Sequence, residues 1–208
     1  MWDVIARASD LVAHYPALAI ALAFAGAVIE AVAVLGVLVP GTPILMAVAG
    51  AAAMAGLPIA PIMIVAILGA IIGDGISFWI GHRYSGHLRR VWPFATRPYL
   101  MTRAEAFFYR YGTMSVALCR FIPVLRSTVP LIAGMAGMRR NRFLLANVCS
   151  ALVWAPAHVL PAQFAGLSIE RLQHGDWQTA ALLGTALLAC AAGAIWLHRA
   201  AKDRRWGG

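Results

Sequence analysis

The feature that most limits how this chain folds is an apolar run, residues 112–138, that contains two arginines and two prolines. Arg120 and Arg126 carry permanent charges. Pro123 and Pro130 each remove a backbone donor and disturb a helix. Broken backbone at membrane depth survives only where protein surrounds it or where it lines a wet cavity. We therefore expect residues 112–138 to form a re-entrant helical hairpin.

Composition places this run in an integral membrane protein. Hydrophobic residues make up 62% of the 208 positions and charged residues only 12%, against about a quarter charged in a soluble domain. The net charge of +9 fits anionic lipid headgroups and basic cytoplasmic loops, and we expect no nucleic acid partner. Cys119, Cys149 and Cys190 lie in apolar stretches and are interpreted as packing residues.

Three stretches are long enough to cross a bilayer core, which needs about 20 apolar residues per helix. They are residues 59–81, 143–166 and 178–198. Residues 17–56 contain one charge, Glu30, and are interrupted at Pro40-Gly41-Thr42-Pro43. We therefore expect another re-entrant hairpin at about residues 30–56. The whole chain, residues 1–208, is predicted to be one domain, with a final loop, helix and basic tail at 167–208.

The distribution of basic residues predicts the orientation. Residues 83–110 carry six arginines and one acid, so this loop is expected in the cytoplasm together with the basic C-terminal tail. Basic residues also flank both ends of the 112–138 hairpin, which suits a hairpin that opens to the cytoplasm. The first hairpin then opens to the outside. The predicted fold is an all-α, polytopic membrane bundle with two re-entrant hairpins in an inverted repeat.

Four charged residues fall within the expected membrane layer: Glu30, Asp74, Arg120 and Arg126. A charge at mid-bilayer costs several kcal/mol, so such residues mostly face a protein interior or an aqueous cavity. One interpretation is a polar binding site between the hairpins. The other is that each acid pairs with an arginine and holds the hairpins together. The two interpretations are compatible.

The two arginines indicate an anionic ligand. On an unbroken helix Arg120 and Arg126 point to opposite faces, because six residues advance about 600°. The break at Pro123 allows both guanidiniums to turn toward one ligand, and their planar forks match phosphate. We therefore predict a phosphorylated ligand. Glu30 and Asp74 are candidate proton carriers, because a desolvated carboxylate can load and release a proton.

The segment that contains the two arginines resembles that of a known family. The segment Arg120-Phe121-Ile122-Pro123-Val124-Leu125-Arg126, followed by Ala133-Gly134-Met135, resembles the signature of the DedA family, whose domain is also called SNARE-associated or VTT. The resemblance extends over about residues 30–166. Further matching positions are Gly69, Gly73, Asp74, Trp79-Ile80-Gly81-His82-Arg83, Gly86, Glu105, Gly112, Phe143, Asn147 and Trp154.

The resemblance implies a multi-pass protein of the bacterial inner membrane that moves a phosphate-bearing lipid, most notably undecaprenyl phosphate. It implies that Arg120 and Arg126 are the essential arginines that bind the phosphate, and that Glu30 is the acid ahead of the Pro-Gly turn. From their own chemistry, Thr42 is a candidate for a hydrogen bond to the phosphate, and Glu30 and Asp74 are the candidates for proton or charge coupling. The residues expected to shape the hairpins are Pro40, Gly41, Pro43, Pro123, Pro130 and Gly134. Family members are also linked to phospholipid translocation and to the proton motive force.

Thr42 departs from the family pattern, because many relatives carry Glu or Asp directly after the Pro-Gly pair. The first hairpin therefore lacks a second carboxylate. Asp74 is then the alternative proton site, protons or sodium are the candidate coupling ions, and uncoupled flipping is also compatible.

A phosphatidylethanolamine flippase or scramblase, a non-transporting scaffold and an ion channel remain alternatives. Tyr84-Ser85-Gly86-His87 contains the Ser-Gly-His of membrane lipid phosphatases, but the second histidine with its carboxylate partner is missing. We therefore expect no enzyme, no catalytic residues, no metal site and no cofactor. Small residues between Ala47 and Gly56 would also permit a homo-oligomer.

Overall fold

The computed structural model describes residues 2–32, 35–37, 41–85, 95–96, 98–173, 175–179, 181–182, 184–185 and 188. Helices dominate these ranges, and none of them contains a strand, which confirms the predicted all-helical class. The elements are α1 Trp2–His14, α2 Pro16–Ala31, η1 Leu35–Val37, α3 Gly41–Met54, α4 Ala60–Tyr84, α5 Pro98–Tyr111, α6 Thr113–Leu118, η3 Cys119–Phe121, α7 Pro123–Arg126, α8 Thr128–Met135 and α9 Arg140–Gln173.

Two described helices are long and apolar enough to cross a membrane. They are α4, with 25 residues, and α9, with 34 residues, and they coincide with the spans predicted at 59–81 and 143–166. The helix α9 continues through Pro156 and Pro161. Several predicted features lie wholly or largely outside the described residues: the span at 178–198, the basic tail, Pro40, and residues 86–94 and 97 of the basic loop.

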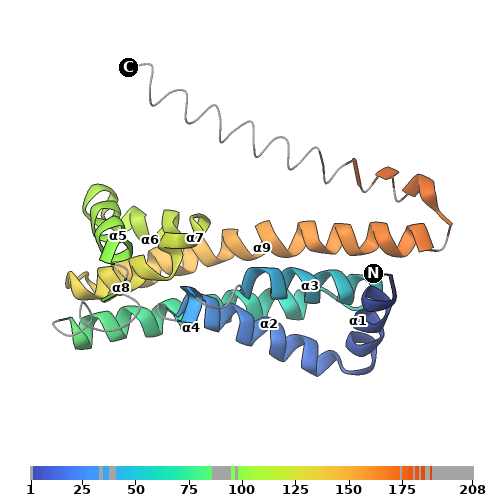
Figure 1. Cartoon of the computed structure of the whole chain (residues 1–208), viewed down its shortest axis with the longest axis horizontal. Helices are drawn as coiled ribbons and strands as arrows, with labels where there is room; N and C mark the ends of the chain where they lie inside the picture. Colours follow the sequence, from blue (N-terminus) through green and yellow to red (C-terminus); the bar gives the residue numbers. More distant parts are fainter. Residues whose placement is uncertain are drawn as a thin grey trace, which may run out of the picture.

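The two long helices run antiparallel along the long axis of the bundle (Figure 1). Toward one end lie α1, α2 and α3, and toward the other lie α5, α6, α7 and α8 (Figure 1). The helix α4 packs against both α2 and α8, while α9 packs against both α3 and α6. Each long helix therefore connects the two groups of shorter helices.

The first apolar run folds into two helical arms, α2 and α3. The predicted start of this hairpin at residue 30 is wrong, because the first arm already begins at Pro16. Glu30 lies near the end of that arm and is buried there. A charge that is neutralised inside the protein does not have to mark the start of a helix, and this explains the difference.

The second apolar run is divided into short pieces, none longer than the eight residues of α8. Ile122 has an extended backbone, φ −118° and ψ 107°, directly before Pro123 opens α7. A residue that precedes proline is pushed toward this conformation. Pro130 lies in the first turn of α8, where its missing N–H takes little from the helix. The break predicted at Pro123 is confirmed, and Pro130 does not interrupt α8.

The connections into the two long helices have the same local geometry. Gly56 follows α3 with φ +67°, and Gly137 follows α8 with φ +69°. In each case the residue after the glycine donates its N–H to the carbonyl five positions back, which is the Schellman end of a helix. These bonds join Leu57 to Ala52 at 2.9 Å and Met138 to Ala133 at 3.0 Å.

Small residues fill the contacts between helices. The fully buried alanines on α2, α3 and α4 include Ala23, Ala27, Ala49, Ala52, Ala66 and Ala70. A Cβ added at Gly134 would lie 2.1 Å from the carbonyl oxygen of Phe78, and one at Gly166 would lie 2.2 Å from that of Gly50. Small residues allow such close backbone approach, which is how helices associate within membranes.

The outward faces of the long helices are apolar. On α4, Ile64 is 56% exposed, and on α9 the exposed fractions reach 68% at Leu145 and 60% at Val153. Large exposed apolar surfaces mark sites of contact with another apolar phase or partner. On two helices of membrane-spanning length, they indicate contact with lipid.

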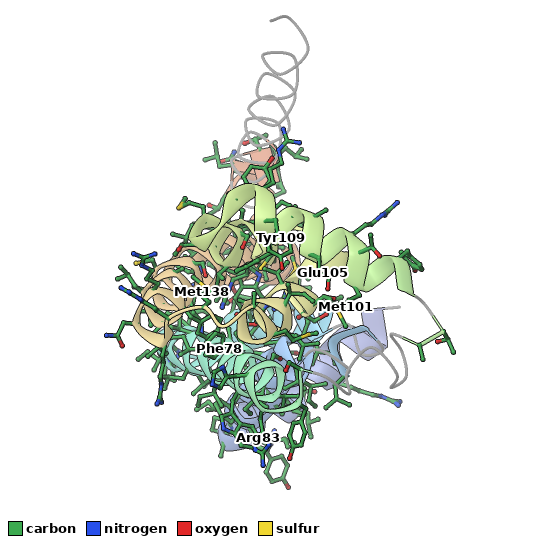
Figure 2. All side chains as sticks on the ribbon, turned by 90° about the vertical axis from the view of Figure 1, so that its left-hand side faces the viewer. Phe78, Arg83, Met101, Glu105, Tyr109 and Met138 are labelled. Carbon is green, nitrogen blue, oxygen red and sulfur yellow. The ribbon has the colours of Figure 1, made fainter. Side chains whose placement is uncertain are left out.

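Basic residues gather at one end of the bundle. Figure 2 looks at this end, which includes α5 and the last turn of α4, from which Arg83 projects outward. Arg110 lies in the last turn of α5, and Arg140 opens α9. Tyr109 is 77% exposed on α5. This end therefore combines cations with exposed aromatic rings, a combination typical of a membrane–water interface.

Candidate functional site

The four charges singled out in the sequence are all buried. Their exposed fractions are 8% for Glu30, 4% for Asp74, 4% for Arg120 and 6% for Arg126. They come from four elements: the end of α2, the middle of α4, η3 and α7. The structure joins them into two ion pairs, Glu30 with Arg126 and Asp74 with Arg120.

The first pair is centred on Thr42. Nη1 of Arg126 lies 2.8 Å from Oε1 of Glu30. The Thr42 hydroxyl lies 2.8 and 2.7 Å from the two oxygens of the same carboxylate and 3.1 Å from Nη1 of Arg126. This hydroxyl therefore donates to Glu30 and accepts from Arg126. One hydrogen-bonded group links the end of α2, the first turn of α3 and the short helix α7.

The position of Thr42 depends on the glycine before it. A Cβ added at Gly41 would lie 2.2 Å from the carbonyl oxygen of Gly26. Only glycine allows the first turn of α3 to approach α2 this closely. Pro43 follows as the third residue of α3, where a missing N–H is tolerated. The sequence Gly41-Thr42-Pro43 therefore starts a helix and presents the hydroxyl toward Glu30.

The second pair is completed by an amide. Arg120 donates through Nη2 to Asp74 and also to the side-chain oxygen of Asn147 on α9. The Asn147 side-chain nitrogen in turn donates to the carbonyl oxygen of Ile71, at 3.1 Å. These bonds connect η3, α4 and α9. Asn147 was not predicted as a site residue, although a side-chain amide within an apolar span is a signal that could have identified it.

The ring of Trp154 lies close to both arginines. The Cζ atom of Arg126 is 4.7 Å from the centre of its ring, and that of Arg120 is 6.0 Å away. These distances fit cation–π contacts, which are strongest in desolvated surroundings. Trp154 is fully buried in α9. The sequence interpretation did not place Trp154 in the site, because a tryptophan in an apolar span carries no signal that separates binding from packing.

The site retains hydrogen-bonding capacity that the described residues do not use. Four buried atoms have no hydrogen-bond partner among those residues: Nε and Nη1 of Arg120, Nε1 of Trp154 and Oγ of Ser127. A buried polar group without a partner costs about 1–3 kcal/mol. Such groups call for a ligand, an ion or a water. Three of the four atoms belong to the arginine and the tryptophan that form the site.

The glycines around Asp74 have different surroundings. A Cβ at Gly73 would lie 2.6 Å from that of Ala31, so Gly73 allows α4 to approach α2 closely. A Cβ at Gly75 would meet nothing within 4 Å. Gly75 therefore takes no part in helix packing and faces open space.

Comparisons with known proteins place the chain in a family. The VTT domain matches residues 39–164. Inner membrane protein YabI of Escherichia coli K12 is 32% identical over 187 residues, covering 86% of this chain and 72% of YabI. The uncharacterized membrane protein Rv2637 of Mycobacterium tuberculosis H37Rv is 33% identical over 150 residues, or 69% of each chain. No solved structure was found to match. The chain therefore belongs to the VTT-domain, or DedA, family of membrane proteins.

Proposed function

We propose that this protein is a flippase that carries a phosphate-bearing lipid, most notably undecaprenyl phosphate, across the bacterial inner membrane. The observation that carries the proposal is the burial of two guanidiniums, Arg120 and Arg126, beside donors that no described residue satisfies. A purely structural ion pair needs no spare N–H groups. A phosphate offers several acceptor oxygens, and the planar fork of an arginine can donate two parallel N–H groups to them.

In the proposed mechanism, phosphate and carboxylate compete for the same guanidinium. The pair of Arg126 with Glu30 represents the form without lipid. When Glu30 takes up a proton, its attraction for Arg126 falls, and a lipid phosphate replaces it. The Thr42 hydroxyl, which already bonds both partners, then donates to a phosphate oxygen. Release of the proton restores the ion pair and expels the phosphate.

This exchange couples lipid movement to protons. Asp74 and Arg120 form a second carboxylate–guanidinium pair. A phosphate can replace the carboxylate of Asp74 there in the same way, once Asp74 takes up a proton. Binding a phosphate while a carboxylate is protonated avoids adding net charge to a region where charge costs several kcal/mol. Sodium at the freed carboxylates is the alternative coupling ion.

The proposed architecture is an inverted repeat. The pair α2 and α3 with α4 forms one unit, and the pieces α6 to α8 with α9 form the other. The antiparallel course of α4 and α9 and the matching helix ends at Gly56 and Gly137 support this division. We propose that both hairpins are re-entrant and that their tips meet at the ion pairs. Relative movement of the units would then open the site to each side in turn.

The proposed orientation places the basic end of the bundle in the cytoplasm. Arg83, Arg110 and Arg140 lie at this end, together with the start and end of the 83–110 loop. The excess of arginine follows the positive-inside rule. The second hairpin then opens toward the cytoplasm, and the first opens toward the outside.

A non-transporting scaffold is the second candidate, because all four buried charges are paired with one another in this form. A double substitution that exchanges the charges of Glu30 and Arg126 distinguishes a scaffold from a flippase. In a scaffold, the double variant Glu30→Arg/Arg126→Glu keeps a pair and keeps function. In a flippase, the double variant removes the guanidinium of residue 126 that binds the lipid phosphate, and transport is lost.

The test is transport by the purified full-length protein in liposomes. Flipping of undecaprenyl phosphate and of phosphatidylethanolamine would be measured with and without a pH gradient. The variants are Arg120→Lys and Arg126→Lys, which keep the charge and lose the planar fork, and the control is Arg142→Lys. We expect polyprenyl phosphate flipping that both site variants abolish and the control retains. Flipping of phosphatidylethanolamine alone would identify a different lipid, and no flipping of either lipid would reject the proposal.

A further inference from the structure

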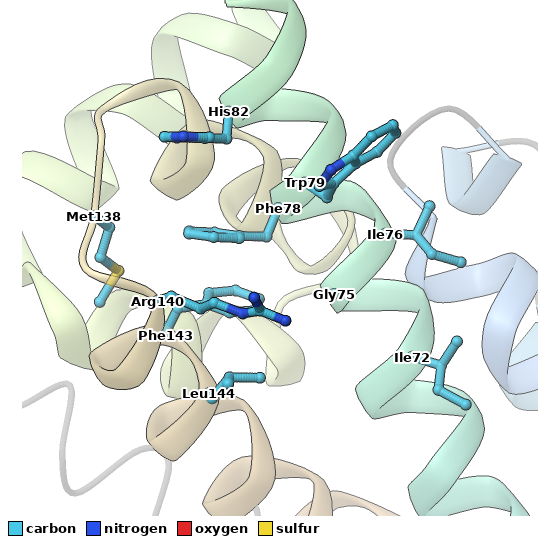
Figure 3. A pocket seen from close by; sticks show the side chains of 10 residues that line it. All are labelled: Ile72, Gly75, Ile76, Phe78, Trp79, His82, Met138, Arg140, Phe143 and Leu144. Carbon is cyan, nitrogen blue, oxygen red and sulfur yellow. The ribbon is translucent and has the colours of Figure 1, made fainter.

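A cavity separate from the ion pairs opens between α4 and α9 at the basic end of the bundle. Its volume is about 690 Å³, enough for a substantial part of a hydrocarbon chain. Apolar side chains form most of the lining, and Arg140 and His82 add basic groups (Figure 3). We call this cavity the lateral groove. Its lining consists of Ile72, Gly75, Ile76, Phe78, Trp79, His82, Met138, Arg140, Phe143 and Leu144.

One wall of the lateral groove is a stack of three rings. Phe78 lies 4.1 Å from Phe143 between ring centres, with an angle of 18° between the planes. On its other side it stacks on His82, at 6.4 Å and 8° (Figure 3). Phe143 is 1% exposed, so the stack is anchored in the protein. The wall is therefore aromatic, with a histidine at its outer end.

The other side of the lateral groove faces outward. Ile72, Ile76 and Trp79 on α4 are 45%, 39% and 60% exposed. They belong to the apolar face that we assign to lipid contact. A lipid chain can therefore pass from the bilayer into the groove without crossing a polar surface.

Arg140 gives the lateral groove a permanent cation. Its side chain extends from α9 toward α4 at the level of Gly75 (Figure 3). A guanidinium beside apolar walls favours an amphiphile that carries an anionic group, and phosphate fits its fork. A neutral lipid would leave this charge without a counterpart. Charge complementarity thus selects a lipid with a phosphate headgroup.

The deep end of the lateral groove lies next to the ion pairs along both helices. Gly75 directly follows Asp74 on α4, and Leu144 precedes Asn147 by one turn on α9. Arg140 lies two turns before Asn147, which is about 10 Å along the helix axis. A lipid phosphate at Arg140 would therefore be within a short movement of the guanidinium of Arg120.

We infer that the lateral groove is a first binding site for the transported lipid, with its chain along the aromatic wall and its phosphate at Arg140. This inference rests on the proposed function for the choice of a phosphate-bearing lipid. The occupant is a single anionic lipid of the leaflet at the basic end of the bundle, and the groove lies on its path between that leaflet and Arg120 and Arg126.

Gly75 allows the groove to be filled without disturbing the fold. A Cβ at this position meets nothing within 4 Å, so Gly75→Trp places its ring in the groove. Leu145→Trp is the matched control, because Leu145 is 68% exposed on α9 and does not line the groove. For the charge, Arg140→Gln is compared with Arg142→Gln. Both arginines are exposed in the first turn of α9, and Arg140 alone of the two lines the groove.

The measurement is photo-crosslinking of the full-length protein in nanodiscs to a photoreactive polyprenyl phosphate, with the matching polyprenol as the uncharged probe. We expect crosslinks on residues 72–82 and 138–144. Arg140→Gln should reduce them by about tenfold, which corresponds to the loss of one strong ionic contact. Gly75→Trp should reduce them at least as much because its ring fills the groove, while both controls retain them. Equal crosslinking in Gly75→Trp and Leu145→Trp would overturn the inference, as would equal labelling by the polyprenol.

The flipping assay separates this inference from the proposed function. If the protein forms groove crosslinks but flips no lipid, the groove is a lipid-binding site and the proposed flippase function is wrong. Flipping without groove crosslinks would retain the flippase and reject the groove. In Arg126→Lys, we expect groove crosslinks to persist while flipping is lost, because the first site lies outside the ion pairs.

Discussion

Arg126 and Glu30 are 96 positions apart in the sequence and form an ion pair of 2.8 Å in the interior of the bundle. Their side chains are 7% and 10% exposed. The pair joins the end of the first apolar arm to the short helix that follows the break at Pro123. Because one partner comes from each apolar run, this contact fixes the two runs relative to each other.

Removal of one partner from this pair should destabilise the protein by about 3–5 kcal/mol, because it leaves a buried charge unpaired. Arg126→Gln and Glu30→Gln should each show this loss. The double variant should be less destabilised than the sum of the single variants, because neither charge is then left alone. Equilibrium unfolding in mixed detergent micelles measures all three values. Strict additivity would mean that the two side chains do not interact in the membrane.

The hydroxyl of Thr42 should contribute to the stability of the protein. Thr42→Val keeps the shape and removes the group that bonds Glu30 and Arg126, so we expect a loss of about 1–3 kcal/mol in stability. Thr42→Ser keeps the hydroxyl and should stay close to the parent. The free energy of unfolding and the rate of lipid flipping would be measured for both variants and for the parent protein. A valine variant as stable as the serine variant would show that the hydroxyl is dispensable for the pair.

The charged positions could be predicted from the sequence because charge within an apolar run has few explanations. Glu30, Asp74, Arg120 and Arg126 were identified in this way, and the pairing of each acid with an arginine was one of the two interpretations. Which acid pairs with which arginine could not be predicted. That assignment depends on how the helices cross, and the crossing depends on backbone contacts at small residues such as Gly41.

The parts that sequence reasoning missed are those without a periodic or charged signal. Trp154 is one apolar residue among many in α9, and only the fold shows that two guanidiniums approach it. The start of α2 at Pro16 was missed because Glu30 was interpreted as the beginning of a hairpin arm. The open space beside Gly75 was missed as well, since a glycine in a helix has the same sequence signal whether a neighbour or open space faces it.

Trp154 should stabilise both arginines through its ring. Trp154→Leu removes the ring that lies 4.7 Å from the Cζ atom of Arg126, and we expect a loss of about 3 kcal/mol or more from the cavity and the lost cation–π contacts. Trp154→Phe retains a smaller ring and should lose less. The free energy of unfolding would be measured for the two variants, both alone and combined with Arg126→Gln. The comparison shows whether the ring acts through the guanidinium of Arg126. If the difference between leucine and phenylalanine persisted unchanged in that background, the ring would contribute only by packing.

Gly134 and Gly75 offer a matched pair for the role of glycine in this bundle. A methyl group at Gly134 would lie 2.1 Å from the carbonyl oxygen of Phe78, so α8 and α4 must separate to accept Gly134→Ala. We expect a loss of about 1–3 kcal/mol, the typical cost of overpacking.

Gly75→Ala meets no neighbour within 4 Å and lies within the long helix α4, where alanine is favoured over glycine by about 1 kcal/mol. This substitution should therefore leave stability unchanged or raise it slightly. Unfolding of both variants under the same conditions measures the difference. Because the two substitutions are chemically identical, a similar loss at both positions would mean that helix flexibility, and not backbone contact, explains the glycines.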